Sequence, residues 1–246
     1  MKTSSPFVFT SGTIGYPILF VLLIWIVFWA ELKFGLNLSP YGVRPGELIG
    51  LRGILFSPFI HSDIKHLFNN TIPLFILSLS LFYFYRPIRW KVLLIGLVFT
   101  GILTWLIGRP ANHIGASGII YLLASFLFFK GIFSKYYRLV ALSLIVVFIY
   151  GGLVWYVTPI DPEISWEGHL SGMISGVLLA LVFKKNIAEA PKYSWEKPDY
   201  SVEDDLFMKH FDENGNFVDN LPIEKDPPAE DPGYNYIYTE KNADKD

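Results

Sequence analysis

The chain has 246 residues, of which 52% are hydrophobic and only 17% are charged. Soluble domains carry about 25% charged residues, so this composition argues against an ordinary soluble enzyme, and the apolar content excludes disorder for most of the chain. The sequence contains no cysteine, which excludes disulfides, a thiol nucleophile and cysteine-ligated metal sites. Charge divides the chain, because residues 1–184 hold 13 basic and 6 acidic side chains, whereas residues 185–246 hold 7 basic and 16 acidic ones.

Six apolar stretches follow one another along the first three quarters of the chain. They cover residues 16–30, 67–85, 92–108, 111–129, 139–160 and 168–183. A membrane-spanning helix needs about 20 largely apolar residues. The sixth stretch is short, but Lys184 and Lys185 after it can extend to the lipid headgroups. The stretches leave almost no amphipathic pattern to face water. The sequence therefore predicts an all-α membrane protein with six transmembrane helices.

The connections between the stretches predict an orientation and a domain division. Basic residues gather after the second, fourth and sixth stretches, which favours cytoplasmic chain ends, although the long first connection also carries basic residues. This connection, residues 33–65, is rich in Gly, Pro and apolar residues, so we expect it to lie in the membrane interface. We divide the chain into a short cytoplasmic N-terminus (1–15), a six-helix domain (16–184) and an acidic, flexible cytoplasmic tail (185–246).

The acidic tail gives little further signal. Its residues 212–216 resemble part of a calcium loop but lack the remaining ligand spacing, so we expect no metal there. A solvated tail and a partner-binding or regulatory segment are both compatible with its composition.

Polar side chains stand at the starts of the even-numbered stretches, where a membrane makes them costly. They are His66, Asn69 and Asn70 at the start of the second stretch, His113 and Ser117 at the start of the fourth, and His169 at the start of the sixth. Even-numbered stretches all enter the membrane from the same side. We therefore expect the three clusters to meet at one depth, in or just below the outer leaflet.

Glycine spacing indicates that the fourth and sixth stretches approach closely. The glycines concerned are Gly115 and Gly118 beside the serine, and Gly168, Gly172 and Gly176 along the face of the histidine. Small residues at this spacing let two helix backbones approach each other. The Ser117 hydroxyl can then reach hydrogen-bond distance of the His169 ring.

A serine beside a histidine base is the minimum for nucleophilic acyl transfer. His66, Asn70 and the Ser117 backbone N–H are suitable donors for the oxyanion of the tetrahedral intermediate. The ring of Tyr121, four residues after the serine, could stack on His169. Asp161 and Glu167 are predicted to be loop residues, so no buried carboxylate is expected as a third member, and we predict a dyad.

These residues together resemble the rhomboid family of intramembrane serine proteases. The matching segments are 61–70 (HSDIKHLFNN), 115–121 (GASGIIY) and 168–176 (GHLSGMISG), and the resemblance covers about residues 14–184. It implies a six-helix bundle that cleaves transmembrane or juxtamembrane segments of other membrane proteins through an acyl-enzyme. By this resemblance Ser117 is the nucleophile, His169 the general base, and His66 and Asn70 part of the oxyanion hole. Tyr121 matches the residue that stacks on the catalytic histidine.

Other positions match the family less directly. His61 matches the first histidine of the family's motif and is expected to brace the first connection rather than to act in catalysis. Leu51 and Arg52 stand where the family has a Trp-Arg pair, so Arg52 retains a loop role while the anchoring of that loop is in doubt. His113 is either a polar loop residue or a part of gating or substrate contact.

The resemblance also implies partners and location. It implies membrane-protein substrates in a lipid bilayer, with no nucleic acid, cofactor or metal, and it leaves the oligomeric state open. A bacterial-type inner membrane is expected, with the active site towards the external side. The fifth stretch and the connection after it (158–167) form the expected gate.

Two rival functions stay open at this point. A catalytically inactive rhomboid-like protein would bind membrane clients with the same fold, but it would not need the intact set Ser117, His169, His66 and Asn70. A small transporter would use His66 and His169 for protons, and it would be expected to show paired carboxylates or inverted repeats. Neither feature is visible in the sequence.

Overall fold

The computed structural model describes residues 9–134, 136–183, 193, 195, 198–205, 207–212 and 214–218. Residues 1–191 and 192–246 form two separate compact units. The sequence predictions for Lys184 and Lys185, for residues 1–8 and for most of the acidic tail lie outside the described residues.

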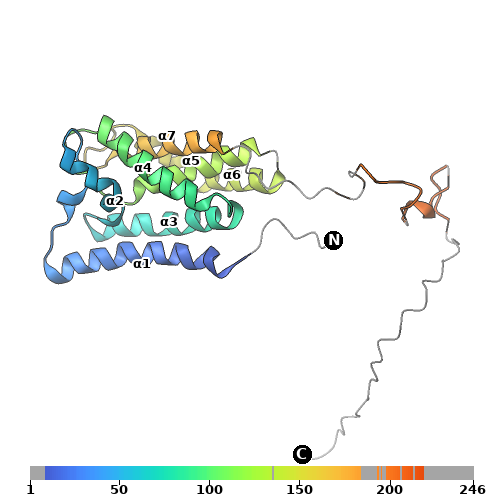
Figure 1. Ribbon diagram of the computed structural model, residues 1–246, viewed down its shortest axis with the longest axis horizontal. Helices are drawn as coiled ribbons and strands as arrows, with labels where there is room; N and C mark the ends of the chain where they lie inside the picture. The colour runs from blue at the N-terminus through green and yellow to red at the C-terminus, as the bar shows by residue number, and fades with distance from the viewer. Residues whose placement is uncertain are drawn as a thin grey trace, which may run out of the picture. The chain divides into compact units, whose positions relative to one another are not determined.

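The described part of the first unit is a helical bundle. Its helices are α1 (Ser11–Phe34), the short α2 (Gly53–Phe56), α3 (Ile64–Phe84), α4 (Arg89–Ile107), α5 (Ser117–Phe133), α6 (Tyr137–Tyr150) and α7 (Trp166–Val182). Figure 1 shows the six longer helices lying side by side, with α2 at one end of the bundle. The predicted all-helical class is confirmed for the described residues.

Among the described residues, four helical segments are long and apolar enough to cross a membrane. They are α1, α3, α4, and α6 together with the 3-10 helix η4 that follows it (Tyr137–Val157). The helices α5 and α7 are apolar but have 17 residues each, which gives a length of about 26 Å against a hydrocarbon thickness of about 30 Å.

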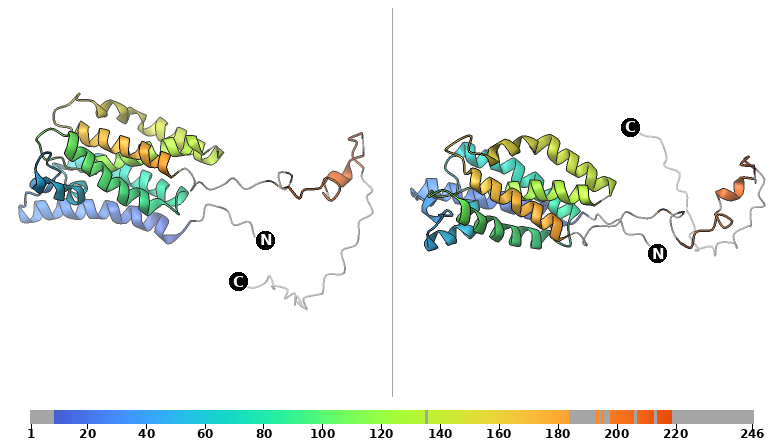
Figure 2. Two further views of the ribbon diagram at one scale, coloured as in Figure 1. Left: turned by 45° about the horizontal axis from the view of Figure 1, so that its top comes forward. Right: turned by 90° about the horizontal axis from the view of Figure 1, so that it is seen from above.

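Helix α5 lies at the centre of the bundle. It packs against α7, α6, α3 and α4, while α1 packs against α3. The left view of Figure 2 shows α1 and α6 on opposite flanks. A helix that is apolar all round belongs in the interior, and α5 buries residues on every side, among them Leu122, Leu123, Phe126 and Leu127. Helix α6, by contrast, leaves Phe148 90% exposed, as expected for a helix that faces lipid.

Three predicted boundaries move, each for a local reason. The fourth stretch was expected to be helical from residue 111, but α5 begins only at Ser117, because Gly115 has φ +107° and interrupts regular helix. The α-helix of the fifth stretch ends at Tyr150 and continues as η4 (Gly151–Val157), beginning at a Gly-Gly pair of poor helix propensity. Helix α7 begins two residues early, at Trp166, because the Ser165 side chain accepts a hydrogen bond from the Gly168 N–H.

The first connection folds into short turns of helix rather than a loose loop. They are η1 (Ser39–Tyr41), η2 (Leu48–Arg52), α2 and η3 (Ser57–Phe59). Arg52 donates to the Pro40 carbonyl at 3.0 Å, and its guanidinium lies 4.2 Å from the centre of the Tyr41 ring. Arg52 therefore links η2 to η1 within this connection. Leu48 is 81% exposed, and its placement in the membrane interface stays a prediction.

The described part of the second unit is a local turn structure. Asp212 Oδ1 accepts hydrogen bonds from the backbone N–H groups of Asn214 and Asn216, and Oδ2 accepts from Asn216 Nδ2. The carboxylate of the calcium-like segment thus organises its own turn. Phe211 and Phe217 form a backbone bridge across that turn.

Candidate active site

The starts of α3, α5 and α7 meet at one end of the bundle. A Cβ on Gly115, just before α5, would lie 2.7 Å from His66 Nε2 and 3.6 Å from Asn70 Nδ2 on α3. A Cβ on Gly118, at the start of α5, would lie 3.5 Å from the Gly168 carbonyl of α7. The predicted convergence of the three polar clusters is therefore what the fold produces.

The glycines of α7 allow direct backbone contact with α5. A Cβ on Gly172 would lie 2.1 Å from the Gly118 carbonyl oxygen, and a Cβ on Gly176 would lie 2.0 Å from Ser125 Oγ. Both distances are far below a van der Waals contact, so only glycine fits. This close packing brings the segment that carries His169 next to the segment that begins with Ser117.

His169 is held by two contacts, and the residue on which it stacks is itself anchored. Its ring stacks on Tyr121 with centroids 4.2 Å apart and an interplanar angle of 11°. The Tyr121 hydroxyl donates to the Leu153 carbonyl at 2.8 Å. His169 Nδ1 lies 2.9 Å from the Tyr156 carbonyl oxygen, and both carbonyls belong to η4. The ring is 8% exposed.

The bond to Tyr156 selects the proton position on His169. A carbonyl oxygen accepts but cannot donate, so Nδ1 carries the hydrogen. In the neutral imidazole Nε2 then keeps its lone pair, which is the form a general base needs. The group that orients the histidine is thus a backbone carbonyl, and sequence reasoning missed it because a main-chain atom leaves no residue signature.

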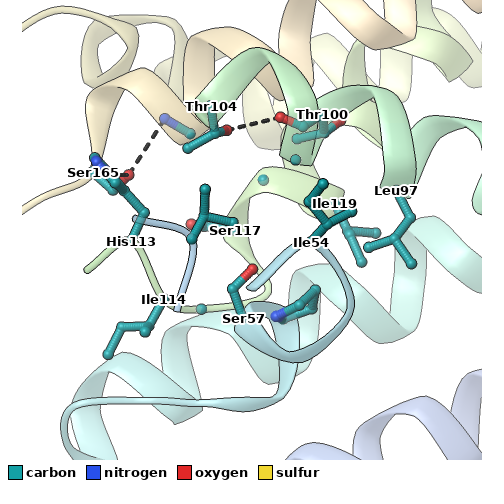
Figure 3. Close-up of a pocket in the computed structure, with 16 residues that line it drawn as sticks. Ile54, Ser57, Leu97, Thr100, Thr104, His113, Ile114, Ser117, Ile119 and Ser165 are labelled. Carbon is teal, nitrogen blue, oxygen red and sulfur yellow. Dashed lines mark hydrogen bonds between the residues drawn. The ribbon is translucent and has the colours of Figure 1, made fainter. Parts of the chain in front are cut away.

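Ser117 is the first residue of α5. The first N–H groups of a helix have no partner within the helix, so the Ser117 N–H is a free donor in the helical pattern. Ser117 also lines a cavity of about 40 Å³, which is room for a few water molecules. Figure 3 shows other lining residues from the first connection, α4 and the third connection: Ile54, Ser57, Thr100, Thr104 and His113. The hydrogen bond from Ser117 to His169 stays a prediction.

Asn70 presents a donor without an acceptor. The residue is 5% exposed, and its Nδ2 is buried without a hydrogen-bond partner. Leaving such a donor unpaired costs about 1–3 kcal/mol. Nδ2 faces Gly115, two residues before Ser117. An unpaired donor at this position is suited to stabilise an oxyanion, which forms only during the reaction.

Whether His66 can donate from Nε2 depends on its tautomer. Its Nδ1 lies 3.1 Å from Ser62 Oγ, and that hydroxyl donates to Asp63 Oδ2 at 2.7 Å. A hydroxyl has one hydrogen, so in this arrangement Nδ1 of His66 donates to Ser62 and Nε2 of the neutral ring is bare. The predicted Nε2–H of His66 requires the Ser62 hydrogen to turn towards Nδ1, or a protonated ring. Asn70 and the Ser117 N–H need no such change.

His61 links the first connection to the loop before α5, whereas the sequence predicted only a role within the first connection. Its Nε2 accepts from the Ala116 N–H at 3.4 Å, Nδ1 lies 3.4 Å from the Phe59 carbonyl, and its ring meets His66 edge-on at 5.0 Å. Burial, followed by the neighbouring His66, lowers the pKa of His61 from 6.5 to about 4. A second proton on the ring would face the Ala116 N–H, so the neutral form is the one that fits.

Acid is expected to destabilise the protein through His61. Its folded pKa lies below its unfolded pKa, so its contribution is complete above about pH 6.5 and is lost as the pH falls towards about 4. The linked loss amounts to at most roughly 3 kcal/mol. Thermal unfolding in detergent between pH 7 and pH 4 measures it, and His61→Gln should flatten the pH dependence. An equal pH dependence in both proteins would contradict this assignment.

The prediction that Glu167 is a loop residue is wrong. Glu167 lies in the first turn of α7 and is 1% exposed. Its Oε1 accepts from the Arg109 N–H at 3.2 Å and pairs with Arg109 Nε at 3.6 Å. A buried carboxylate is therefore present two residues from His169, but it pairs with Arg109, while His169 Nδ1 bonds to the Tyr156 carbonyl.

His113 lies in the third connection, between α4 and α5, but it is only 5% exposed. Its Nδ1 lies 2.6 Å from Ser165 Oγ and its Nε2 lies 3.0 Å from the Arg109 carbonyl. Its backbone pairs with Val43 of the first connection. His113 thus ties the first, third and fifth connections together. A part in gating or substrate contact stays a prediction.

The fold and the site define a helical membrane protein in which two closely packed helices carry a serine and an oriented histidine. The family model for the Rhomboid domain matches residues 49–186. Uncharacterized proteins of Mycobacterium bovis and Mycobacterium tuberculosis are each 36% identical over 177 residues, covering 65% of this chain and 71% of the relative. An uncharacterized protein of Mycobacterium leprae is 36% identical over 160 residues, covering 58% and 61%. The chain belongs to the rhomboid family.

Proposed function

We propose that the protein is an intramembrane serine endopeptidase that cleaves transmembrane or juxtamembrane segments of membrane proteins. The observation that carries this proposal is the Nδ1 bond of His169 to the Tyr156 carbonyl, which leaves Nε2 as a base beside the start of α5. Membership of the rhomboid family and the unpaired Nδ2 of Asn70 support the same conclusion.

The reaction proceeds in two acyl transfers. Ser117 Oγ attacks the scissile carbonyl carbon while His169 Nε2 takes the hydroxyl proton. The Ser117 N–H and Asn70 Nδ2 donate to the oxyanion. The C–N bond then breaks, and His169 returns the proton to the leaving amine. Water attacks the acyl-enzyme with His169 again as base, which releases the new carboxyl end and restores Ser117. The cavity beside Ser117 has room for that water.

Membrane placement belongs to the same proposal. Helices α5 and α7 complete six spans, with both termini in the cytoplasm of a bacterial-type cell and the site towards the external side. Their short length suits helices in the bundle interior, where α5 is surrounded by neighbours. Substrates are membrane proteins, and a segment to be cut must unwind locally because an intact helix shields its peptide bonds.

The segment proposed as a gate is η4 with the connection after it. The carbonyls of Leu153 and Tyr156 in η4 accept from Tyr121 and His169. Movement of this segment to admit a substrate would therefore act directly on the orientation of the base.

The test is made on the purified protein in mild detergent. A fluorescent fluorophosphonate should label the wild-type protein, and a model transmembrane substrate should be cut. Folded wild-type protein that is not labelled and leaves the substrate intact would move the assignment to the inactive, client-binding form of the rhomboid fold.

A further inference from the structure

Arg109, in the third connection, reaches across to the end of the fifth connection. Its Nη2 donates to the Pro162 carbonyl at 2.9 Å and to the Ile164 carbonyl at 2.7 Å. Its N–H donates to Glu167 Oε1 at 3.2 Å, and its Nε pairs with the same oxygen at 3.6 Å. One arginine thus holds the backbone just before α7 and the first turn of α7 itself.

A second bond between the same two connections lies beside it. His113 Nδ1 and Ser165 Oγ are 2.6 Å apart, and Ser165 Oγ accepts from the Gly168 N–H at 3.3 Å. We call Arg109, His113, Ser165 and Glu167 the α7 clamp. All four act on the residues that immediately precede His169.

The burial of Glu167 indicates positioning rather than added stability. Its side chain is 1% exposed, and Oε2 has no hydrogen-bond partner. Burying a carboxylate is costly, and a buried ion pair is often no more stable than apolar residues of similar volume. The ion pair between Arg109 and Glu167 instead fixes the position of the first turn of α7. A shift of that turn would carry the His169 ring away from Tyr121 and from the Tyr156 carbonyl.

We propose that Arg109 and Glu167 are positioning residues for His169, acting through the first turn of α7. This inference rests on the proposed protease function, because positioning is expressed in the reactivity of the Ser117–His169 pair. A misplacement of about 1 Å can cost on the order of 100-fold in rate.

Kinetics provide the first test. Glu167→Ala and Arg109→Ala should each lower kcat on a transmembrane substrate by about 10- to 100-fold and leave KM within about 2-fold. Fluorophosphonate labelling should slow by the same factor, because this small reagent needs the base but not substrate docking. The double variant should be no slower than the worse single variant, since the two residues act as one device. Glu167→Gln keeps an acceptor for the Arg109 N–H and should recover part of the rate.

The chain offers a matched control in the pair Arg44–Glu47. It joins the same two atoms, Nε and Oε1, but its side chains are 42% and 48% exposed. Glu47→Ala should leave kcat and labelling unchanged. A decrease of kcat in Glu47→Ala equal to that in Glu167→Ala would overturn the proposal. An unchanged kcat in Glu167→Ala, or a change in its KM alone, would overturn it as well. If the alanine variants do not fold, Arg109→Lys replaces them, since its single nitrogen keeps the charge but cannot bond both the two carbonyls and Glu167 Oε1, and it should still lower kcat.

Hydrogen exchange separates this proposal from the proposed function. In Arg109→Ala, backbone amides of residues 158–169 should exchange about 10-fold faster or more, while those of the first turns of α5 stay unchanged. Unchanged exchange in residues 158–169 would overturn the clamp even in an active enzyme. If the wild-type protein neither labels nor cleaves, the protease function fails, and faster exchange would still establish the clamp.

Discussion

Ser117→Ala should abolish fluorophosphonate labelling and lower cleavage of a transmembrane substrate by at least about 1000-fold. His169→Ala should do the same, because without the base the hydroxyl proton of Ser117 has nowhere to go as the oxygen attacks. The double variant Ser117→Ala/His169→Ala should be no slower than either single variant, since residues that act as one unit are strongly non-additive. Gel fluorescence and single-turnover cleavage measure both effects.

A matched serine provides the control for this result. Ser80 lies on α3 and donates to its own helix at the Ile76 carbonyl, 2.9 Å away. Ser80→Ala should label and cleave like the wild-type protein. Residual cleavage in Ser117→Ala near the wild-type rate would remove Ser117 from the role of nucleophile, whatever the behaviour of His169→Ala.

Gly172→Ala should destabilise the protein and disturb the site together. Its Cβ would stand 2.1 Å from the Gly118 carbonyl oxygen and 3.0 Å from Tyr121 Cβ, so α7 and α5 would have to separate. Overpacking of this kind costs about 1–3 kcal/mol. The separation would also move His169 away from Ser117 and Tyr121, so cleavage should fall together with stability. Thermal unfolding in detergent and the cleavage rate measure the two effects.

Gly15→Ala is the control for the glycine substitution. Gly15 lies in α1, and a Cβ there would meet nothing within 4 Å. Alanine has the higher helix propensity by about 1 kcal/mol, so this variant should be neutral or more stable. Equal destabilisation by Gly172→Ala and Gly15→Ala would show that close packing of α5 and α7 is not the cause.

Much of the site was predictable because it depends on local spacing. The four-residue glycine period on the sixth stretch predicts close backbone packing, and the structure has it at Gly172 and Gly176. The spacing of Ser117 and Tyr121 places both on one face of α5, and the predicted stacking of Tyr121 on His169 is observed at 4.2 Å. The start of α5 was placed wrongly, because hydrophobicity does not register the positive φ of Gly115.

Other features could not be predicted from the sequence. Glu167 follows a proline-containing connection, which is typical of a loop residue. It is nevertheless buried, and it is bonded to Arg109, which lies 58 residues earlier in the chain. Neither interpretation of His113 named its partner Ser165, because that residue lies 52 residues away in the chain. A hydrogen-bond partner brought in from a distant segment leaves no local pattern.

The sequence by itself determined the class of protein, the helices and the identity of the candidate serine and histidine, because apolar run length and helical spacing act within one segment. Only the tertiary structure decided which nitrogen of His169 carries the proton, which donor near Ser117 is unpaired, and what fixes the first turn of α7. These properties depend on the Tyr156 carbonyl, on Asn70 facing Gly115 and on Arg109. Proton position and hydrogen-bond satisfaction are set by atoms that meet only when the chain has folded.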